Sequence, residues 1–535
     1  MTHTEKIQAI KTSYQKVKQI ASKDLAYITE QADLSPFYKY APRIESFAKV
    51  IEDKKNDSTD RRTLVEVLKG QYSRLDTAGA VENNINKLLD SRTFTVTTAH
   101  QPCLFTGPLY YIFKIISTIN LAERLSAAYP NYAFVPVFVS GGEDHDFEEV
   151  NHLHLFNKTL RWENTETGSV GMMKTASLQA VLAELKEILG ETPQGQEIFD
   201  IINHAHTRHE IYSDAVIEML HKLFGDYGLV VLNMNHKKLK KLFADVMKEE
   251  IFEQNSFSLV NETIEKLNEK GFSTQANPRD INLFYLKDQM RERIEEADGI
   301  YKIVNTNLTF TKAEMREELE NHPERFSPIV VMRPLFQEKI LPNLAYVGGG
   351  GEIAYWLERK KQFEHFGINF PVLIRRNSAM LLDENTYRRI QKLGFSIEEI
   401  FEPTDFLIRK FVEKNAEGEL NLKEEMSLVE KAFHLIAEKA EIVDPTLVKA
   451  ILAEQTRQVK TIEQLESRLV RTEKQKHETN LNQLKSVKEK LFPGNGLQER
   501  YDNFLPFYLK YGREFFQILK ENLDPFDKSF LTIIA

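Results

Sequence analysis

Cysteine is almost absent from this sequence: Cys103 is the one thiol in 535 residues. A single cysteine excludes an intramolecular disulfide and any zinc site built from several cysteines, and it fits a reducing compartment. Tryptophan is scarce too, with two residues, but phenylalanine and tyrosine raise the aromatic share to 10%. Hydrophobic residues make up 42% of the chain, which is enough to bury a core. At this length we expect two or three domains.

Long apolar runs are also missing. No run approaches the ~20 residues of a membrane-spanning helix, and the opening MTHTEKIQAIK lacks the apolar region of a signal peptide. Lys and Arg total 70 against 79 Asp and Glu, a formal net charge of −9, which does not suggest a globally basic nucleic-acid-binding protein. We expect a cytoplasmic protein that has small-molecule substrates, with neither nucleic acid nor membrane as a partner.

Short apolar strands alternate with helical segments in the middle of the chain. TFTVTT (93–98) and FVPVFVS (134–140) predict two strands around a helix from Pro108 to about Leu125, the β-α-β unit of a parallel sheet. Nearly all-apolar strands between amphipathic helices predict an α/β fold with a doubly wound parallel sheet. The further strand candidates are LVVLNM (229–234), SPIVVM (327–332), LAYV (344–347) and PVLI (371–374).

The first two segments of the chain are assigned to one core. Residues 1–90 are expected to be its mostly helical N-terminal part. Residues 91–400 are expected to be the core itself, with a small hairpin insertion near 285–315.

The chain changes character in its last third. Residues 401–495 are charged and carry apolar residues at helical spacing, which predicts a coiled-coil arm. An antiparallel helical hairpin that turns at Asp444-Pro445 fits the interrupted heptads better than one long helix. Residues 496–535, aromatic and amphipathic, are expected to pack back on the core.

In doubly wound sheets, ligands bind beyond the carboxyl ends of the strands, and a first polar cluster lies at such a position, in HQPCLFTGPLYYIFK (100–114). Gly107 could be the N-cap of the following helix and leave its N–H groups for an anion. Thr106 could add a hydroxyl, and Gln101 a polar contact. Tyr110 and Lys114, four residues apart, share a helix face; the alternative is that Tyr110 packs and Lys114 is solvated. Both interpretations stay open.

Cys103 lies in the same junction, three residues from His100. Proximity to a helix N-terminus could lower the pKa of a thiol and make it a nucleophile. No base of certain geometry follows from the spacing. A small buried thiol is therefore the favoured interpretation.

The second cluster is GGEDHDFEEVNH (141–152), directly after a predicted strand. Glu143, His145 and Asp146 could act as acid and base or hold a metal ion. The alternative is acidic capping of a helix N-terminus. His152 and His154 have no third ligand at diagnostic spacing, so zinc is not expected.

The third cluster is YVGGGGEIAYW (346–356), with Gly348, Gly349, Gly350 and Gly351 between a strand and a helix. Such a loop lets a ligand approach the backbone, although it matches neither a Walker A loop nor the dinucleotide fingerprint. Glu352 could contact a ribose or an amine, or only cap the helix. The residues assigned to the same cleft by position are Tyr355 and, after the strand at 327–332, Arg333 and Gln337, with Arg375-Arg376 ranked lower.

These clusters carry a resemblance to a known family. The chain resembles the bacillithiol-biosynthesis cysteine-adding enzymes over nearly its whole length. That resemblance implies a Rossmann-like core related to class I aminoacyl-tRNA synthetases and other nucleotidyltransferases, connecting insertions, and a coiled coil used for dimerisation. The stretches that carry it are HQPCLFTGPLYYIFK (100–114), VPVFVSGGEDHDFEEVNH (135–152), RFSPIVVMRPLFQEKILPNLAYVGGGGEIAYW (325–356), PVLIRRNSA (371–379) and LFPGNGLQER (491–500).

The sequence departs from the family pattern at several points. Its opening motif has His100 and Cys103 where relatives usually have Gln-Gln-Pro-Gly, so neither residue receives a role by analogy. Four glycines replace Gly-Gly-Pro-Gly. No HIGH or KMSKS motif of the class I synthetases is present, and the cysteines of the zinc site that holds substrate in related cysteine ligases are missing.

The activity implied by the resemblance joins the carboxyl group of L-cysteine to the amine of glucosaminyl malate. ATP-dependent activation through a cysteinyl-adenylate is the simplest route by analogy, with Mg²⁺ as a possible companion of ATP. The catalytic group is predicted to be Lys114, Glu143, His145 and Asp146. Substrate contacts are predicted for Gln101, Thr106, Gly107, Tyr110, Arg333, Gln337 and Tyr355, and the nucleotide is expected against Gly348–Gly351 and Glu352.

Two other hypotheses remain. The missing signature motifs favour a nucleotide-binding scaffold whose coiled coil recruits a catalytic partner. A tRNA-binding arm is the other, but from Glu454 to Lys490 nine Lys and Arg face six Asp and Glu, without interleaved aromatics. A homodimer formed through the arm is favoured. All site assignments assume that the corners at 107, 142 and 350 meet at one mouth of the sheet.

Overall fold

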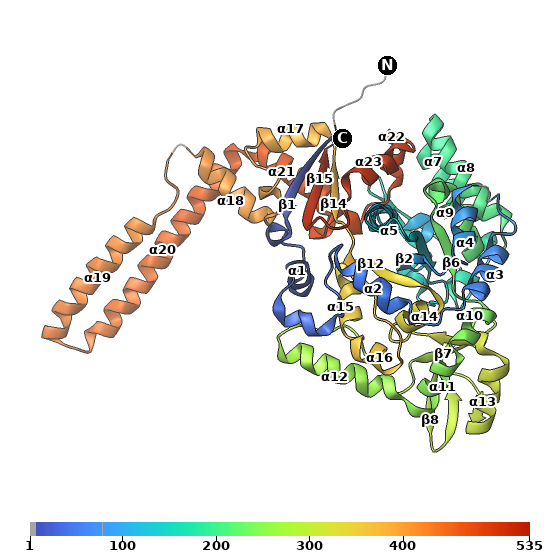
Figure 1. Cartoon of the computed structure of the whole chain (residues 1–535). Helices are drawn as coiled ribbons and strands as arrows, with labels where there is room; N and C mark the ends of the chain where they lie inside the picture. The colour runs from blue at the N-terminus through green and yellow to red at the C-terminus, as the bar shows by residue number, and fades with distance from the viewer. Residues whose placement is uncertain (1–6, 77–78, 417, 535) are drawn as a thin grey trace.

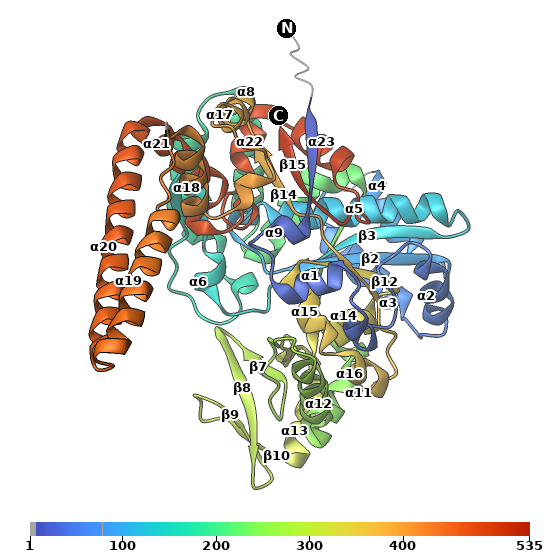
Figure 2. The ribbon, with the colours of Figure 1, turned by 90° about the vertical axis from the view of Figure 1, so that its left-hand side faces the viewer.

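A computed structural model describes residues 7–76, 79–416 and 418–534. Its centre is a five-stranded parallel sheet in the order β13 (Val372–Arg375), β12 (Asn343–Gly348), β2 (Thr93–His100), β3 (Ala133–Ser140) and β6 (Val230–Asn233). From β2 the chain winds outward through β3 to β6, then returns to the other side of β2 for β12 and β13 (Figures 1 and 2). The sheet is therefore doubly wound, and the strand order reverses between β2 and β12.

Threonines of β2 join the two halves of this sheet. Thr97 Oγ1 donates to the carbonyl oxygen of Ala345 at 3.3 Å, and Thr98 Oγ1 to that of Val347 at 2.8 Å. Both hydroxyls are fully buried, so these bonds satisfy polar groups that water cannot reach. The polar residues of β2 therefore suit a strand buried on both faces.

Helices cover the sheet, and the helix that follows β2 differs from the sequence expectation. The helix after β2, α5 (Tyr110–Ala128), begins at Tyr110 and not at Pro108, because Leu109 is its cap residue. The stretch 352–366 forms two helices, α15 (Gly350–Leu357) and α16 (Lys360–His365). The other helices outside the arm are α1 (Ser22–Ile28), α2 (Ser46–Lys54), α3 (Arg61–Tyr72), α4 (Ala80–Lys87), α6 (Phe147–Val150), α7 (Gln179–Leu189), α8 (Pro193–Arg208), α9 (Tyr212–Phe224), α10 (Lys237–Leu242), α11 (Ala244–Glu253), α12 (Asn255–Glu269), α13 (Lys312–Asn321), α14 (Arg333–Ile340), α17 (Glu384–Lys392), α22 (Leu505–Tyr511) and α23 (Glu514–Asn522).

The insertion is a second, antiparallel sheet at the lower edge of Figure 2. Its order is β10 (Thr309–Thr311), β9 (Ile300–Ile303), β8 (Met290–Ala297), β7 (Leu283–Lys287) and β11 (Phe326–Pro328). The strand expected at 327–332 is thus short and belongs to this sheet, because β11 pairs antiparallel with β7. A hairpin of β4 (His152–Leu155) and β5 (Lys158–Arg161) lies apart from it.

A third sheet joins the two ends of the chain. β15 (Ser529–Ile534) lies between β1 (Gln8–Ser13) and β14 (Ala379–Leu382), antiparallel to β1 and parallel to β14. The N-terminal part of the chain is therefore not purely helical.

The arm leaves the body as a helical hairpin (Figure 1). Helix α18 (Thr404–Asn415) precedes α19 (Lys423–Val443), and α20 (Leu447–Lys476) runs back after the turn at Asp444. Helix α21 (Glu478–Leu491) returns the chain to the body of the protein, and its apolar residues are buried among side chains of α17, α18 and β15. The apolar residues Leu481, Leu484, Val487 and Leu491 thus pack against the body of the protein.

Candidate active site

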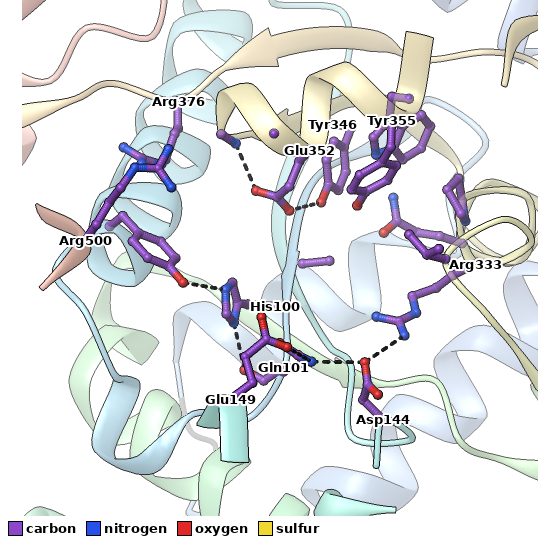
Figure 3. A pocket seen from close by; sticks show the side chains of 18 residues that line it. His100, Gln101, Asp144, Glu149, Arg333, Tyr346, Glu352, Tyr355, Arg376 and Arg500 are labelled. Carbon is purple, nitrogen blue, oxygen red and sulfur yellow. Dashed lines mark hydrogen bonds and ion pairs between the residues drawn. The ribbon is translucent and has the colours of Figure 1, made fainter. Parts of the chain in front are cut away.

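A cavity of about 350 Å³ opens at the carboxyl ends of four strands of the parallel sheet. It lies where the strand order reverses, the position at which doubly wound sheets bind ligands. Figure 3 shows cationic, anionic and aromatic side chains around it. The lining residues are Ala99, His100, Gln101, Tyr110, Asp144, Glu149, Val330, Arg333, Pro334, Gln337, Tyr346, Gly349, Gly351, Glu352, Tyr355, Trp356, Arg376 and Arg500.

Glu352 is held at the top of this cavity by three donors. Its Oε1 accepts from Lys114 Nζ at 2.8 Å and from the Tyr346 hydroxyl at 2.6 Å. Its Oε2 accepts from the backbone N–H of Gly349 at 2.9 Å, which caps α15. Burial has the largest single effect and raises the pKa of Glu352, but the charge of Lys114 and the other groups around the carboxylate together lower it more, so the net pKa is below the usual value. The cavity therefore contains a fixed carboxylate.

Lys114 itself does not line the cavity. Its side chain is fully buried, and its Nζ also donates to the carbonyl oxygen of Ala99. Burial lowers the pKa of this lysine. Since its donors are turned to protein acceptors, Lys114 holds Glu352 in place, and the prediction that it is a catalytic residue of the cleft is corrected.

His100 lies between Tyr110 and the backbone. Its Nε2 is 3.1 Å from the Tyr110 hydroxyl and its Nδ1 is 3.1 Å from the carbonyl oxygen of Gln101. Because a carbonyl oxygen only accepts, Nδ1 carries the proton and Nε2 accepts from Tyr110. Burial, followed by the charge of Lys114, lowers the pKa of His100 to about 4. The imidazole is therefore neutral at physiological pH.

Cys103 is buried beside this histidine, with Sγ 3.5 Å from His100 Nδ1. It lines a side cavity of about 90 Å³ next to the main one. Burial raises the pKa of the thiol to about 12, so it stays protonated. This agrees with a structural thiol and not with a nucleophile.

Asp144 is the acidic residue that the loop after β3 presents to the cavity. Its Oδ2 accepts from Gln101 Nε2 at 3.0 Å and lies 3.6 Å from Arg333 Nη2. Gln101 Nε2 also donates to Glu149 Oε2 at 3.1 Å. On the far side Asp144 Oδ1 is 3.7 Å from Arg291 Nη1 of the insertion. Burial raises the pKa of Asp144. The charges of Arg333 and Arg291 and the hydrogen bonds to the carboxylate together lower it by more, so the net pKa is below the usual value and Asp144 is ionised.

Two arginines form the opposite wall (Figure 3). Arg376 is buried, and its Nη2 donates to Glu499 Oε1 at 2.9 Å, whereas its Nε has no partner among the described residues. Glu499 is fully buried and also accepts from the Ser378 hydroxyl at 3.0 Å. Arg500 follows Glu499 directly and is exposed at the rim. The polar turn at the end of the arm thus supplies Arg500 to the cavity and, through Glu499, holds Arg376 in place.

Three residues predicted to be catalytic point away from the cavity. Glu143 accepts from Ser327 Oγ at 2.9 Å and pairs with buried Lys240. His145 Nδ1 is 2.6 Å from Arg291 Nη1, so this side chain turns to the insertion. Asp146 caps α6 by accepting from the N–H of Glu149 at 3.4 Å. The placement of these three in the cleft is corrected, since each is held by the neighbouring elements.

Thr106 and Gly107 also lie outside the cavity. The backbone turns sharply here, with positive φ at Phe105, Thr106 and Gly107 (43°, 72° and 59°). The Asn503 amide donates to the carbonyl oxygens of Phe105 and Gly107 at 3.1 and 2.5 Å. Leu109 N–H, near the start of α5, donates to the carbonyl oxygen of Asp502 at 2.8 Å. The C-terminal segment therefore occupies the corner that was expected to bind an anion.

The four glycines of the third cluster divide into two pairs. Gly349 and Gly351 line the cavity, and a side chain could be added at Gly351 without a contact under 3.8 Å. A Cβ on Gly350 would lie 2.1 Å from Asp24 Oδ2, and one on Gly348 would lie 2.8 Å from Tyr346 Cε1. Gly348 and Gly350 therefore permit packing within the protein and do not form a ligand cradle.

Comparisons with known proteins agree with this architecture. The family description "Bacillithiol biosynthesis BshC, N-terminal Rossmann-like domain" matches residues 6–377, and "Bacillithiol biosynthesis BshC, C-terminal coiled-coil domain" matches residues 379–535. The chain belongs to the BshC family. It is therefore a ligase of bacillithiol biosynthesis, and the predicted Rossmann-like core, parallel sheet and helical C-terminal region are confirmed.

BshC relatives resemble the chain along its whole length. Proteins named "Putative cysteine ligase BshC" from Christiangramia forsetii and Flavobacterium psychrophilum are 40% and 39% identical to it. The first match covers 95% of both chains, and the second covers 97% of this chain and 98% of the relative. A solved structure titled as a putative arginyl-tRNA synthetase from Campylobacter jejuni is 12% identical over 86% of this chain and 96% of its own. Its TM-score is 0.20, too low to bear on the fold.

Several cavity residues of this BshC chain escaped the sequence argument. Arg376 was ranked low in the sequence analysis, although it follows β13 as Gln101 follows β2. Asp144 was in the acidic cluster, but side-chain direction within a loop depends on partners distant in sequence. The other residues missed are His100, Glu149, Tyr346, Trp356 and Arg500.

Two kinds of feature are absent from the described residues of this BshC chain. No group of three or more His, Cys, Asp or Glu side chains there is arranged to hold a metal ion. Among the same residues, no helix has the length and apolar character needed to cross a bilayer.

A second cavity, of about 790 Å³, lies where the arm of the BshC chain rejoins the body, beside the end of β14. Nearby, Gln498 accepts from the N–H of Leu381 at 2.8 Å, extending the edge of β14. Gln498 therefore has a structural role in this turn. The polar and charged residues of that cavity include Asp383, Lys490, Asp502 and Lys510.

Proposed function

We propose that this chain joins the carboxyl group of L-cysteine to the amine of glucosaminyl malate, with ATP as the activating co-substrate, in the cavity described above. One observation supports this most: a cavity at the switch point of the sheet combines arginines with ionised carboxylates. The substrates of the proposed reaction carry both carboxylates and amines, and a site that binds them needs groups of both charges.

Arginines are the groups suited to the carboxylates. Arg333 and Arg500 line opposite sides of the cavity, and Arg376 adds an Nε that has no described partner. Guanidinium groups bind carboxylates through two parallel hydrogen bonds. We assign the malate carboxylates to Arg333, a residue that the sequence analysis predicted to contact substrate.

Carboxylates are the groups suited to the amine. Glu352 and Asp144 are ionised and reach the same cavity. They would hold an incoming ammonium group, and one of them would take its proton as the amine becomes nucleophilic. Lys114 then acts as a positioning residue for Glu352, and Tyr110 and His100 orient the cavity wall.

ATP fits this site only in part. The N-terminus of α15 is capped by Glu352, so the glycine loop does not offer its N–H groups to phosphates. Arg376 and Arg500 would hold phosphate oxygens instead. When bound, ATP would supply the activation that turns a carboxylate into an acyl group open to attack. Mg²⁺ would arrive with the nucleotide.

The test uses purified full-length protein with L-cysteine, ATP and glucosaminyl malate, and measures bacillithiol by mass spectrometry. We expect the thiol product, and cysteine-dependent exchange between ATP and pyrophosphate. Glu352→Gln should slow product formation about 100-fold or more, whereas Asp146→Asn, which removes a carboxylate outside the cavity, should not. Nucleotide binding with neither cysteine-dependent exchange nor product would favour the scaffold hypothesis.

We also propose that the arm forms a homodimer. Leu428, Leu435 and Ile442 recur every seventh residue of α19 and are 65%, 59% and 87% exposed. Such a heptad stripe is the seam of a coiled coil, and α20 already occupies another face of α19. A second copy of the chain is the partner that a self-complementary stripe fits.

A further inference from the structure

Gln337 lies in the first turns of α14 and reaches the cavity between β2 and β12. The residue is 2% exposed, so its amide cannot exchange partners freely with bulk water. A buried amide offers two donor hydrogens and one acceptor oxygen. Which of them faces the cavity decides what the cavity can recognise there.

The first amide hydrogen is taken by Thr97. Gln337 Nε2 lies 3.1 Å from Thr97 Oγ1. The Thr97 hydroxyl has one hydrogen, which it donates to the carbonyl oxygen of Ala345 at 3.3 Å. Since that carbonyl can only accept, Thr97 must accept from Gln337.

The second amide hydrogen is taken by Glu338. Gln337 Nε2 lies 2.9 Å from Glu338 Oε1, which also accepts from Asn343 Nδ2 at 2.8 Å. An ionised Glu338 has no hydrogen to donate, so a rotated Gln337 would set two oxygens against each other. Burial raises the pKa of Glu338 to about 7, so the carboxyl group is ionised above that pH.

Both hydrogens of Gln337 are therefore used, and none of the hydrogen bonds among the described residues ends on its Oε1. We propose that Gln337 is a specificity residue that binds the primary amine of a substrate through Oε1, with Thr97 and Glu338 as positioning residues; this rests on the proposed function. The carboxylates of Glu352 and Asp144 in the same cavity make an ammonium group the fitting donor.

The test measures binding by calorimetry at about pH 8, above the pKa of Glu338. Two ligand pairs differ in the amine: L-cysteine against 3-mercaptopropionate, and glucosaminyl malate against glucosyl malate. Gln337→Met keeps the shape of the side chain and removes the acceptor. We expect it to weaken one amine ligand about 10-fold to 100-fold and to leave its amine-free counterpart unchanged. The pair that responds identifies which amine is bound.

Thr97 supplies the control for orientation. Thr97→Val frees one amide hydrogen and should reproduce part of the loss, whereas Thr97→Ser should restore wild-type binding. Thr98→Val removes an equally buried hydroxyl of the same strand that bonds Val347 and not Gln337, and it should leave the amine preference intact.

The outcomes separate this assignment from the ligase proposal. Equal weakening of amine and amine-free ligands by Gln337→Met, or wild-type affinity for both amine ligands, overturns the role of Gln337. Amine-selective binding without any amide product would sustain that role and count against the ligase. Thr97→Ser behaving like Thr97→Val would overturn the positioning role of the hydroxyl.

Discussion

Lys114 Nζ lies 2.8 Å from Glu352 Oε1, and this ion pair joins α5 to α15 at the wall of the cavity. The lysine side chain is fully buried and the glutamate side chain is 24% exposed. In such a setting each charge depends on the other, because a single buried charge without its partner is costly.

Lys114→Met should therefore lower the free energy of unfolding by about 3 kcal/mol, measured by chemical denaturation. Turnover should fall as well, since Glu352 loses its support. Lys266 makes an exposed pair of the same 2.8 Å length with Glu262, so Lys266→Met should leave the free energy of unfolding close to that of the wild type. Unchanged turnover in Lys114→Met would remove the lysine from the mechanism, and similar stability losses for both variants would contradict the burial argument.

Two neighbouring glycines should respond differently to the same substitution. Gly350→Ala would place Cβ 2.1 Å from Asp24 Oδ2, and Asp24 is held by Arg375 at 3.1 Å. The clash should cost about 1–3 kcal/mol of stability, seen as a lower midpoint in thermal unfolding. Gly351→Ala meets nothing closer than 3.8 Å and should unfold like the wild type. If Gly351→Ala were the less stable of the two, the packing explanation for Gly350 would fail.

Glu338 should make stability depend on pH. Its pKa rises from 4.5 to about 7 on folding because burial disfavours the charge. Between those values the native state keeps a proton that the unfolded state has released, so stability falls as pH rises and levels off above the folded pKa. From about pH 5.5 to about pH 8 the loss should be about 2 kcal/mol. Denaturation of wild type and Glu338→Gln at both pH values measures it; a constant difference between the two proteins would argue against the shift.

The arm should control the oligomeric state. Leu435→Glu places a charge in the exposed stripe of α19 and should convert a dimer to a monomer in sedimentation velocity. Because the residue is already 59% exposed in the single chain, the fold of the monomer should survive. Leu89 is 51% exposed on the body, so Leu89→Glu should leave the dimer intact. A wild-type protein that sediments as a monomer would end the proposal.

Much of the fold follows from local sequence. Five stretches predicted as strands, beginning near residues 93, 134, 229, 344 and 371, form the parallel sheet, because apolar runs bounded by turns suffice to mark buried strands. SPIVVM was assigned to that sheet by the same rule. Only Ser327 and Pro328 of it are strand residues, and they pair with β7. An apolar run indicates that a strand is buried, but it does not indicate which sheet the strand joins.

The cavity was predictable where position along a strand decides it. Gln101, Glu352 and Arg333 reach it because each follows a strand or opens a helix at the expected edge. The direction in which a loop side chain points was not predictable. Glu143 turns to Lys240 and His145 to Arg291, so the member of the acidic cluster that faces the cavity is selected by partners far away in the sequence.

The small sheet has a consequence for biosynthesis on the ribosome. β1 and β14 each border β15, which is made last of the three. While the nascent chain grows, both flanking strands therefore expose unpaired edges, which invite association with other chains. When the final segment leaves the ribosome, β15 pairs with β1 and β14 and covers both edges at once. Shielding of these edges, by a chaperone or by delayed collapse, would then matter most just before translation ends.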